Sequence, residues 1–293
     1  MHSRRIAEFF IEAAIFLAGT LSILFVILIF IFLLKESLSL FETTSLWDFL
    51  TGKDWYPISY PPRFGILPLI LGSVWVTVGA IAISVPLSVS CAIYIAEVAP
   101  RWLRDLLKAG VELLAAIPSV VLGFIGLTAL VPLVQGVFHL PTGLTALSGS
   151  LMLGFMAVPT IVSITEDALT NVPRSYREGA LALGATHWQT IWRVLLPAAS
   201  PGLVAAVMLG VGRVIGETMA VMMITGNAAQ IPSSFLQPVR TMTATIAAEM
   251  GEAVRGSDHY FALFSIGIVL FMITFFINLT ADFFLHRERQ KLS

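Results

Sequence analysis

Six separate stretches of this chain are long and apolar enough to cross a lipid bilayer, and this feature restricts the fold more than any other. A membrane-spanning helix needs about 20 predominantly apolar residues. A soluble all-α protein would need six buried helices with almost no polar faces. Charged residues make up only 12% of the chain, against about 25% in a typical soluble domain. We therefore expect an all-α polytopic membrane protein with six transmembrane helices, at residues 9–34, 65–96, 107–136, 146–166, 199–226 and 260–285.

The distribution of Lys and Arg over the connecting segments predicts how these helices are oriented. Eleven such residues fall on one side of the membrane and five on the other, while Arg213 lies inside the fifth apolar stretch. The richer side is expected to be cytoplasmic, and both chain termini belong to it. Its basic residues are Arg4, Arg5, Arg101, Arg104, Lys108, Arg174, Arg177, Arg193, Arg287, Arg289 and Lys291.

The first apolar stretch is expected to be a retained span rather than a signal peptide, because it is too long for one and no small-residue cleavage site follows it. We divide the chain into residues 1–64, which hold this span and an outer segment, and residues 65–293, the main transmembrane domain. The single cysteine, Cys91, excludes an internal disulfide. Four aromatic residues of the outer segment are expected to lie at the membrane interface, namely Trp47, Trp55, Tyr56 and Tyr60.

Helix-breaking and small residues are frequent inside the spans. Pro118-Ser119, followed by Gly123 and Gly126, indicates a third span that is kinked or locally unwound. Broken backbone at membrane depth survives only where it is buried in protein or lines a cavity. The alternative interpretation is ordinary kinking, which is common in proteins with several spans. Gly212 and Gly216 form a G-x-x-x-G pair, a pattern that permits close helix approach.

The longest cytoplasmic segment, residues 167–198, carries two consecutive helix-start signatures. Ser175 with Glu178 and Thr186 with Gln189 both fit a capping box, in which two orphan amides are satisfied reciprocally. Gly184 stands between them, where a left-handed residue would end the first helix. Pro197 is expected to stop the second helix. The segment is therefore predicted to form two short helices joined by a tight elbow.

Aromatic residues on this elbow suggest a docking role. A helix that displays Tyr176, Trp188 and Trp192 can lie in the groove of a partner protein. Capping alone is a sufficient account of Ser175 and Thr186. A DNA-binding helix-turn-helix is disfavoured because both ends of the element are tethered to spans, so no nucleic-acid partner is expected.

Arg213 and Glu217 lie inside the fifth apolar stretch. A charge within hydrocarbon costs several kcal/mol, on the order of 3, so such residues are candidates for function before structure. Four residues apart, they are predicted to share one helical face. A fixed cation at mid-depth indicates an anion pathway, whereas an ion pair that only locks the helix bundle is the structural alternative.

Three hydroxyl side chains are further candidates for the substrate pathway: Thr160, Ser163 and Thr218. Each of them could equally satisfy a neighbouring backbone carbonyl. Glu112 and Glu166 are predicted near the cytoplasmic ends of the third and fourth spans, where a role toward partners or water outweighs a role toward substrate.

The chain lacks the motifs of several enzyme classes. No Walker A sequence is present, so energy from ATP would have to come from a partner. There is no G-x-S-x-G and no H-E-x-x-H, and the five histidines do not cluster along the sequence. No catalytic or metal-ligating residue is therefore expected, and a membrane enzyme is the least favoured class.

The elbow resembles a known motif. Glu178-Gly179-Ala180, then Gly184, then Val194-Leu-Leu-Pro197 is similar to the E-A-A-x3-G-x9-I-x-L-P loop of the binding-protein-dependent ABC importer permease family. The spacing matches throughout, although Gly179 replaces the first Ala and Val194 replaces Ile. The resemblance implies that residues 167–198 form the coupling helix that seats in an ATPase subunit. The docking residues it implies are Arg174, Glu178, Gly179, Ala180, Gly184 and Trp188.

Further segments extend the resemblance over nearly the whole chain. The sequences at 64–68, 116–124, 163–169, 172–180 and 212–221 are similar to the C-type (PstC-type) permease subunits of phosphate ABC transporters. The ending Gly216-Glu-Thr-Met-Ala-Val221 favours the C-type over its A-type sister. The resemblance implies the bacterial cytoplasmic (inner) membrane, an A-type sister permease, two copies of a cytoplasmic ATPase that carries ATP and Mg, and an external phosphate-binding protein. No cofactor is expected on this chain.

The expected function is import of inorganic phosphate by alternating access, with this chain forming half of the pathway. Arg suits phosphate because its planar guanidinium donates paired hydrogen bonds and stays charged when buried. Three roles stay open for Glu217: it holds Arg213 when substrate is absent, it accepts a proton-bearing phosphate oxygen, or it weakens binding enough for release. The alternatives are a permease for another oxyanion, such as sulfate or molybdate, and a channel or ion-driven transporter without an ATPase.

Overall fold

The computed structural model describes residues 2–292, with side chains described for residues 11–280. Six of its helical segments are long and apolar enough to cross a membrane. The all-α fold with six spans is therefore confirmed. The spans are Ile11–Glu42, Leu67–Val98, Ser119–Phe138, Ala146–Thr170, His187–Gly216 and Asp258–Thr280.

Fifteen labelled elements and four tighter or wider helical turns make up the described chain. The helices are α1 (His2–Leu38), α2 (Leu46–Thr51), α3 (Leu67–Ile93), α4 (Arg101–Ala116), α5 (Ser119–Ile125), α6 (Val131–Phe138), α7 (Ala146–Thr170), α8 (Arg174–Ala182), α9 (His187–Thr190), α10 (Leu196–Gly216), α11 (Met219–Ile224), α12 (Met242–Glu249) and α13 (Asp258–Leu292). A short hairpin joins β1 (Trp55–Tyr56) to β2 (Arg63–Phe64). The turns are 3₁₀ at Ser39–Glu42 and π-helical at Tyr94–Val98, Gly126–Leu130 and Ile191–Leu195.

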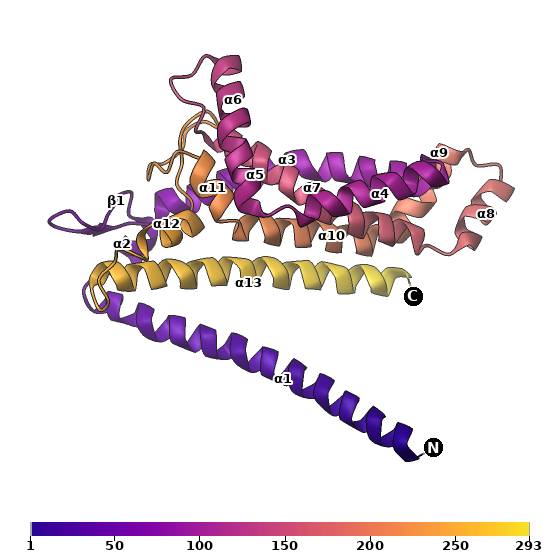
Figure 1. Cartoon of the computed structure of the whole chain (residues 1–293), viewed down its shortest axis with the longest axis horizontal. Coiled ribbons are helices and arrows are strands. Elements are labelled where there is room, and N and C mark those ends of the chain that lie inside the picture. Colours follow the sequence, from indigo (N-terminus) through magenta and orange to yellow (C-terminus); the bar gives the residue numbers. More distant parts are fainter. Residues whose placement is uncertain (1, 293) are drawn as a thin grey trace.

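The long helices run side by side, and α7 occupies the centre, packed against α3, α4 and α10. Figure 1 shows α8 and α9 at the end of the molecule where the chain-terminal ends of α1 and α13 lie. The hairpin, α2 and α12 lie at the opposite end, and α6 projects from the body. The elbow and the two chain-terminal helix ends therefore share one end of the molecule. The basic residues expected at positions 4, 5, 287, 289 and 291 lie outside the residues with described side chains.

Small residues allow the central helices to approach closely. A Cβ atom on Gly79 of α3 would overlap the Ser150 side chain of α7, and one on Gly154 would meet the Ala80 carbonyl. The Ser150 hydroxyl donates to the carbonyl oxygens of Ala146 (2.8 Å) and Val76 (3.3 Å). Within lipid there is no hydrophobic driving force between apolar helices, so close backbone approach and interhelical hydrogen bonds stabilise this pair.

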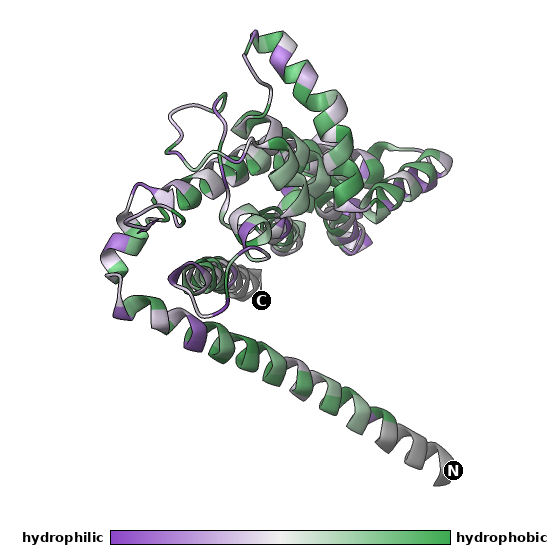
Figure 2. Cartoon of the chain, turned by 60° about the vertical axis from the view of Figure 1, so that its left-hand side comes forward, coloured by the Kyte–Doolittle hydropathy of each residue, from purple (hydrophilic) through white to green (hydrophobic). Residues whose placement is uncertain are grey.

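The first span stands apart from the bundle. Its apolar residues from Ile11 to Leu34 are largely exposed, and Figure 2 shows α1 diverging from the rest with a hydrophobic surface. It contacts α13 near its outer end, where Phe30 lies against Phe271 (5.1 Å between ring centroids) and Phe32 against Phe264 (5.5 Å). An apolar helix surface of this extent is consistent with contact to lipid or to another membrane helix.

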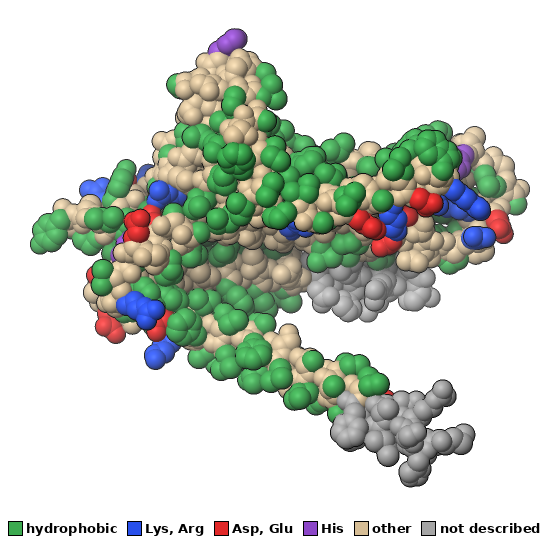
Figure 3. Space-filling model, viewed as in Figure 1, with side chains coloured by type: hydrophobic (Ala, Val, Ile, Leu, Met, Phe, Trp, Pro, Cys, Tyr) green, Lys and Arg blue, Asp and Glu red, His purple; other side chains and the backbone are tan. Residues whose placement is uncertain are grey.

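Charged side chains gather near the two ends of the long helices, and hydrophobic ones lie between them (Figure 3). At the hairpin end, Glu249 accepts hydrogen bonds from Arg240 Nη1 (2.5 Å) and Trp55 Nε1 (3.1 Å) and lies 2.9 Å from His259 Nε2. Trp55 is only 2% exposed. Trp55 was predicted to be an interfacial anchor, but its ring is buried in the apolar core at this end of the molecule and its N–H donates to the Glu249 carboxylate.

The third span differs from the prediction at its start. Residues 107–136 do not form one span, because the separate helix α4 ends at Ala116 and the spanning segment begins at Ser119. Ile117 has ψ 127°, the extended conformation that a following proline imposes, and Pro118 has ψ 137°. The break at Pro118 was predicted. The separate amphipathic helix α4 was not predicted, because its apolar residues run on in the sequence into those of the third span.

The fifth span also differs. Pro197 does not stop the helix that begins at His187: the chain continues through the π-helical turn Ile191–Leu195 directly into α10. Pro197 lies in the first turn of α10, where its missing N–H leaves the π-turn hydrogen bonding intact. At its other end the helix stops at Gly216, well before the predicted residue 226.

Candidate functional site

The fifth span breaks within the sequence Gly216-Glu217-Thr218. Glu217 adopts an extended backbone (ψ 130°), and the helix resumes only as the short α11. Glycine costs about 1 kcal/mol in a helix interior, and the Thr218 hydroxyl bonds the Gly216 carbonyl (3.2 Å), which offers the backbone an alternative to the helix. The break therefore follows from local chemistry, and its peptide groups take hydrogen bonds from side chains, including Thr218 and Thr243, in place of the regular helical ones.

Arg213 lies one turn before this break and reaches α7. Its Nη1 donates to Thr160 Oγ1 over 3.2 Å, and both residues are half-buried. The two helices approach closely here because Gly210 has no side chain: a Cβ atom there would lie 2.6 Å from the Ile161 side chain. The structure thus brings together Arg213 and Thr160, two of the predicted pathway residues.

Glu217 does not share the helical face of Arg213, because it lies beyond the helix end. Among the described side chains no ion pair joins Arg213 to Glu217. Its Oε1 instead accepts from the Ala220 backbone N–H (3.3 Å), and its own carbonyl accepts from Thr243 Oγ1 (3.0 Å). The predicted face-sharing pair was wrong, since the i to i+4 geometry requires continuous helix.

A small polar cavity of about 10 Å³ lies beside the break. Broken backbone at membrane depth is stable only where protein or a cavity satisfies it, and here Thr243 of α12 supplies one hydrogen bond. The sequence left the form of segment 227–259 open. In the structure its short helix α12 lies beside the break, where Thr243 contacts Glu217. Hydroxyl and carboxyl groups line the cavity, from Ser73, Thr77, Glu217, Thr241 and Thr243.

The two other predicted hydroxyls lie elsewhere. Thr218 is half-buried and its hydroxyl is engaged with Gly216. Ser163, three residues after Thr160, lines a separate small cavity together with Lys108, Glu112 and Glu166. The structure therefore does not place Ser163 on the same cavity as Glu217.

The G-x-x-x-G pair does not mediate packing within the described chain. A Cβ atom on Gly212 or Gly216 would meet nothing within 4 Å, and both glycines are exposed. The glycines that do allow close packing of α10 against α7 are Gly210 and Gly202, whose Cβ atom would overlap that of Ala168. One face of α10 near Arg213 is thus left open.

The elbow contains the short helix α8 and the predicted tight turn at Gly184, but the predicted second short helix is instead the start of the fifth span, and one of the two expected capping boxes forms. Thr186 and Gln189 make the reciprocal pair (3.3 and 2.9 Å), and Gly184 has φ +83°. The Ser175–Glu178 box was wrong: α8 begins two residues earlier than this box requires, with Pro173 as its N-cap, and Ser175 falls inside the helix. The proline fixes the entry of the helix without a side-chain cap.

The surface of the elbow is exposed and partly apolar. Of the residues predicted to dock an ATPase, Ala180 is half-buried and the others are exposed, namely Arg174, Glu178, Gly179, Gly184 and Trp188. Leu183 is 91% exposed beside them and was missed by the sequence analysis. Leu183 and Trp188 are thus exposed apolar side chains on the elbow, at an end of the molecule where charged side chains also lie.

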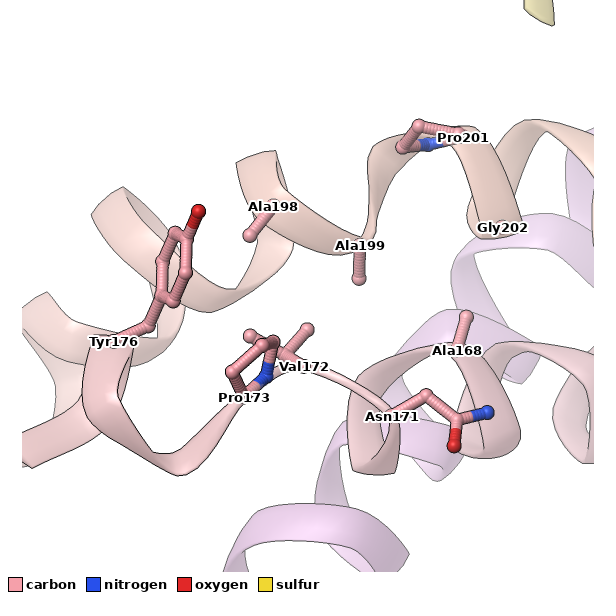
Figure 4. A pocket seen from close by; sticks show the side chains of 9 residues that line it. All are labelled: Ala168, Asn171, Val172, Pro173, Tyr176, Ala198, Ala199, Pro201 and Gly202. Carbon is pink, nitrogen blue, oxygen red and sulfur yellow. The ribbon is translucent and has the colours of Figure 1, made fainter. Parts of the chain in front are cut away.

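A cleft of about 310 Å³ lies at the base of the elbow (Figure 4). Tyr176 of α8 and Ala198 of α10 stand on either side of it, and Asn171 and Pro173 form the connection from α7. The elbow is therefore not packed tightly against α10 on this side. This leaves room for α8 to move relative to the bundle.

Two ion-pair groups hold the elbow end together. Lys108 of α4 donates to Glu166 (2.7 Å) and Asp167 (3.2 Å) of α7, and the hydrogen bond to Glu166 is the main cause of its raised pKa. Arg177 of α8 pairs with Glu97, which lies in the π-helical turn after α3 and is only 2% exposed. These pairs connect elements that are distant in the sequence, and no motif in the sequence pointed to them.

Comparison with known proteins decides the family. Residues 84–290 match the family described as binding-protein-dependent transport system inner membrane component. The chain belongs to this family. It is 43% identical over 242 residues to the probable ABC transporter permease protein YqgH of Bacillus subtilis (strain 168), covering 83% of this chain and 78% of the relative. This permease chain is also 37% identical over 307 residues to the phosphate transport system permease protein PstC of Mesorhizobium japonicum, covering 96% of this chain and 92% of the relative.

Solved structures show the same fold. The inward-facing MetNI methionine ABC transporter matches 79% of this chain and 99% of its own chain, with a TM-score of 0.58 at 20% identity. A bacterial alginate ABC transporter in complex with a periplasmic protein matches 75% of this chain and 78% of its own, with a TM-score of 0.57 at 15% identity. The chain is thus a multi-pass membrane protein with the fold of an ABC importer permease.

Proposed function

We propose that this chain is the permease subunit of an ATP-driven importer of inorganic phosphate and forms half of its translocation pathway by alternating access. Relatives named phosphate transport system permease protein PstC support the cargo: two of them, from Mesorhizobium japonicum and Haemophilus influenzae, are 37% and 34% identical over 96% and 91% of this chain. The family membership supports the mechanism, in which a binding protein delivers substrate to the membrane subunits.

The single observation that carries the proposal is Arg213, a guanidinium beside a helix break in a span. It is half-buried, and within the described chain it bonds only the neutral hydroxyl of Thr160. Its charge is therefore not neutralised by a carboxylate there, and it remains available to an anion. Phosphate offers the paired oxygen acceptors that a planar guanidinium binds in bidentate fashion.

The geometry favours Thr160 over Glu217 as the residue that holds Arg213 when substrate is absent. Glu217 caps α11 and lines the small polar cavity, so it is close to the break without touching the guanidinium. Its remaining proposed roles are to accept a proton-bearing phosphate oxygen, or to weaken binding enough for release. Thr218 and Ser163 are assigned supporting positions along the pathway.

The open glycine face of α10 supports a sister permease as the other half of the pathway. Gly212 and Gly216 are exposed there, and small residues permit close contact between helices in a membrane. A second helix on this face would enclose Arg213 between two subunits. The A-type sister permease is the proposed partner.

The elbow supports the remaining partners. Two copies of a cytoplasmic ATPase, one on this chain and one on the sister, supply ATP and Mg chemistry, and this chain hydrolyses nothing itself. The elbow end is then cytoplasmic together with both chain termini, and the hairpin end receives the external phosphate-binding protein. The exposed Leu183 and Trp188 fit a groove in the ATPase.

The proposal is tested in proteoliposomes that contain the complete transporter, with phosphate uptake and ATP hydrolysis measured together. Arg213→Ala is expected to abolish uptake while the ATPase still co-purifies, and Arg213→Lys to retain the charge with weaker, non-bidentate binding. Sulfate and molybdate are added as competitors of phosphate. Normal uptake by Arg213→Ala would refute the substrate role, and competition by sulfate equal to that by unlabelled phosphate would change the cargo to another oxyanion.

A further inference from the structure

The π-helical turn after α3, Tyr94–Val98, is held by two arginines from two different elements. Arg104 of α4 donates from Nε to the Ile95 carbonyl (2.8 Å) and from Nη2 to the Ala96 carbonyl (2.5 Å). Arg177 of α8 donates from Nη2 to Glu97 Oε1. The helix ends at this turn, and the last carbonyl groups of a helix have no intrahelical partners, so they can accept hydrogen bonds from side chains of other elements. It therefore connects α3, α4 and α8 at one point.

The pair of Arg177 with Glu97 connects this turn to the elbow, because Arg177 belongs to α8. Glu97 is 2% exposed, and its carboxylate is paired with a guanidinium that is 37% exposed. Removing Arg177 would leave the buried Glu97 carboxylate without its partner, whereas the exposed part of the guanidinium is screened by solvent. The elbow is therefore tied firmly to the end of the second span. On its other side lies the cleft of about 310 Å³, which separates α8 from α10.

One atom of this pair is left unsatisfied. Arg177 Nε is buried and has no hydrogen-bond partner among the described residues. Within the described residues the guanidinium therefore reaches the Glu97 carboxylate through Nη2 alone, as a single hydrogen bond.

The second span in turn reaches the substrate residues. α3 packs along α7, with Gly79 against Ser150 and Ala80 against Gly154. α7 carries Thr160, which holds Arg213. The close contact and the hydrogen bond from the Ser150 hydroxyl to the Val76 carbonyl join these helices, and close-packed interiors transmit a displacement of one element to the next.

We propose that Glu97 is a positioning residue that receives the motion of the ATPase-docking elbow through Arg177 and passes it to α3 and α7. The inference rests on the proposed function of the elbow. It adds that transmission runs through the second span, which is not contiguous with the elbow in the sequence. The direct connection from α9 to α10 is then not the only path from the elbow to Arg213.

The experiment uses proteoliposomes with the complete transporter, loaded phosphate-binding protein and ATP. Three quantities are measured: the ATPase that co-purifies, the rate of ATP hydrolysis and the phosphate imported per ATP. Glu97→Gln keeps the shape and removes the charge. It is expected to leave co-purification and ATP hydrolysis near wild type while phosphate per ATP falls about fivefold or more, the lower end of typical coupling effects. Arg177→Lys keeps the positive charge but loses the planar guanidinium, and its phosphate imported per ATP is expected to lie between those of wild type and Glu97→Gln.

Two further variants make the result specific. Asp105→Asn removes an exposed carboxylate on the adjacent α4 and is expected to keep the wild-type ratio. The double variant Glu97→Gln/Arg177→Gln is expected to be no worse than the worse single variant, because both act through one contact. Additive losses, an unchanged ratio in Glu97→Gln, or loss of the ATPase from the complex would each overturn the inference. Wild-type vesicles that import no phosphate would instead refute the proposed function.

Discussion

The hydrogen bond between Arg213 and Thr160 predicts a measurable loss of transport when the hydroxyl is removed. Thr160→Val keeps the volume and the β-branch, so packing of α7 against α10 is preserved. Hydrogen bonds to charged groups contribute about 1.5–3 kcal/mol. Both side chains are half-buried and the distance is 3.2 Å, so we take about 1–1.5 kcal/mol, at or below the lower end of that range. Because 1.4 kcal/mol is a factor of ten, the maximal uptake rate is expected to fall about fivefold to tenfold.

The assay is phosphate uptake by the complete transporter in proteoliposomes, with the loaded binding protein as the varied component. The maximal rate should fall, whereas the concentration of binding protein that gives half the maximal rate should stay constant, because docking occurs at the other surface. Thr160→Ser retains the hydroxyl and should retain most of the rate. Thr128→Val is the matched control, since the Thr128 hydroxyl bonds only carbonyls of its own helical segment (2.9 and 3.4 Å). A rate within twofold of wild type for Thr160→Val, or an equal loss in Thr128→Val, would refute the reasoning.

Three further outcomes are expected. Gly202→Ala should destabilise the packing of α10 on α7 by about 1–3 kcal/mol in thermal unfolding, because its Cβ atom would overlap that of Ala168, whereas Gly110→Ala, with nothing within 4 Å, should not. Gly184→Ala forces a side chain into φ +83°, at a cost of about 1–2 kcal/mol, and should weaken co-purification of the ATPase without changing the melting temperature of the spans. The raised pKa of Lys108 means that its stabilisation is complete below the ordinary lysine pKa of about 10.4 and is lost only as pH rises through the raised value. The stability difference between wild type and Lys108→Gln should therefore be constant from about pH 6 to about pH 9.

The number of spans and the elbow could be predicted because each rests on local sequence. Hydropathy over 20 residues identifies a span regardless of what it packs against. Gly184 and the Thr186–Gln189 box determine a helix end and a helix start within a few residues. The same locality explains why Arg213 was identified: a charge in an apolar run is conspicuous without any knowledge of its neighbours.

The predictions that failed depend on backbone geometry that the residue pattern does not encode. Glu217 was placed on the face of Arg213 by assuming continuous helix, and the break at Gly216 removed that relation. Pro197 was expected to end a helix, but the π-helical turn before it accommodates the missing N–H. The α4 helix was merged with a span because one face of it is apolar. Glu97 and Arg177, 80 residues apart, carry no shared motif and were found only through the fold.

Irregular backbone occurs both at the elbow end of this permease and at the break at Glu217, and the two places are expected to respond differently to movement of the elbow. At the elbow end, the π-helical turn Tyr94–Val98 is tied to α4 by Arg104 and to α8 by Arg177, whereas the other side of α8 faces an open cleft. The elbow is therefore expected to move together with the end of the second span. Between this end and the break at Glu217, α3, α7 and α10 are held by small residues at close contact, which resist internal adjustment. A force applied at the elbow is therefore expected to move the three helices together rather than bend them. The motion is then expected to be taken up at the break beside Arg213, where the extended backbone of Glu217 interrupts the regular helix.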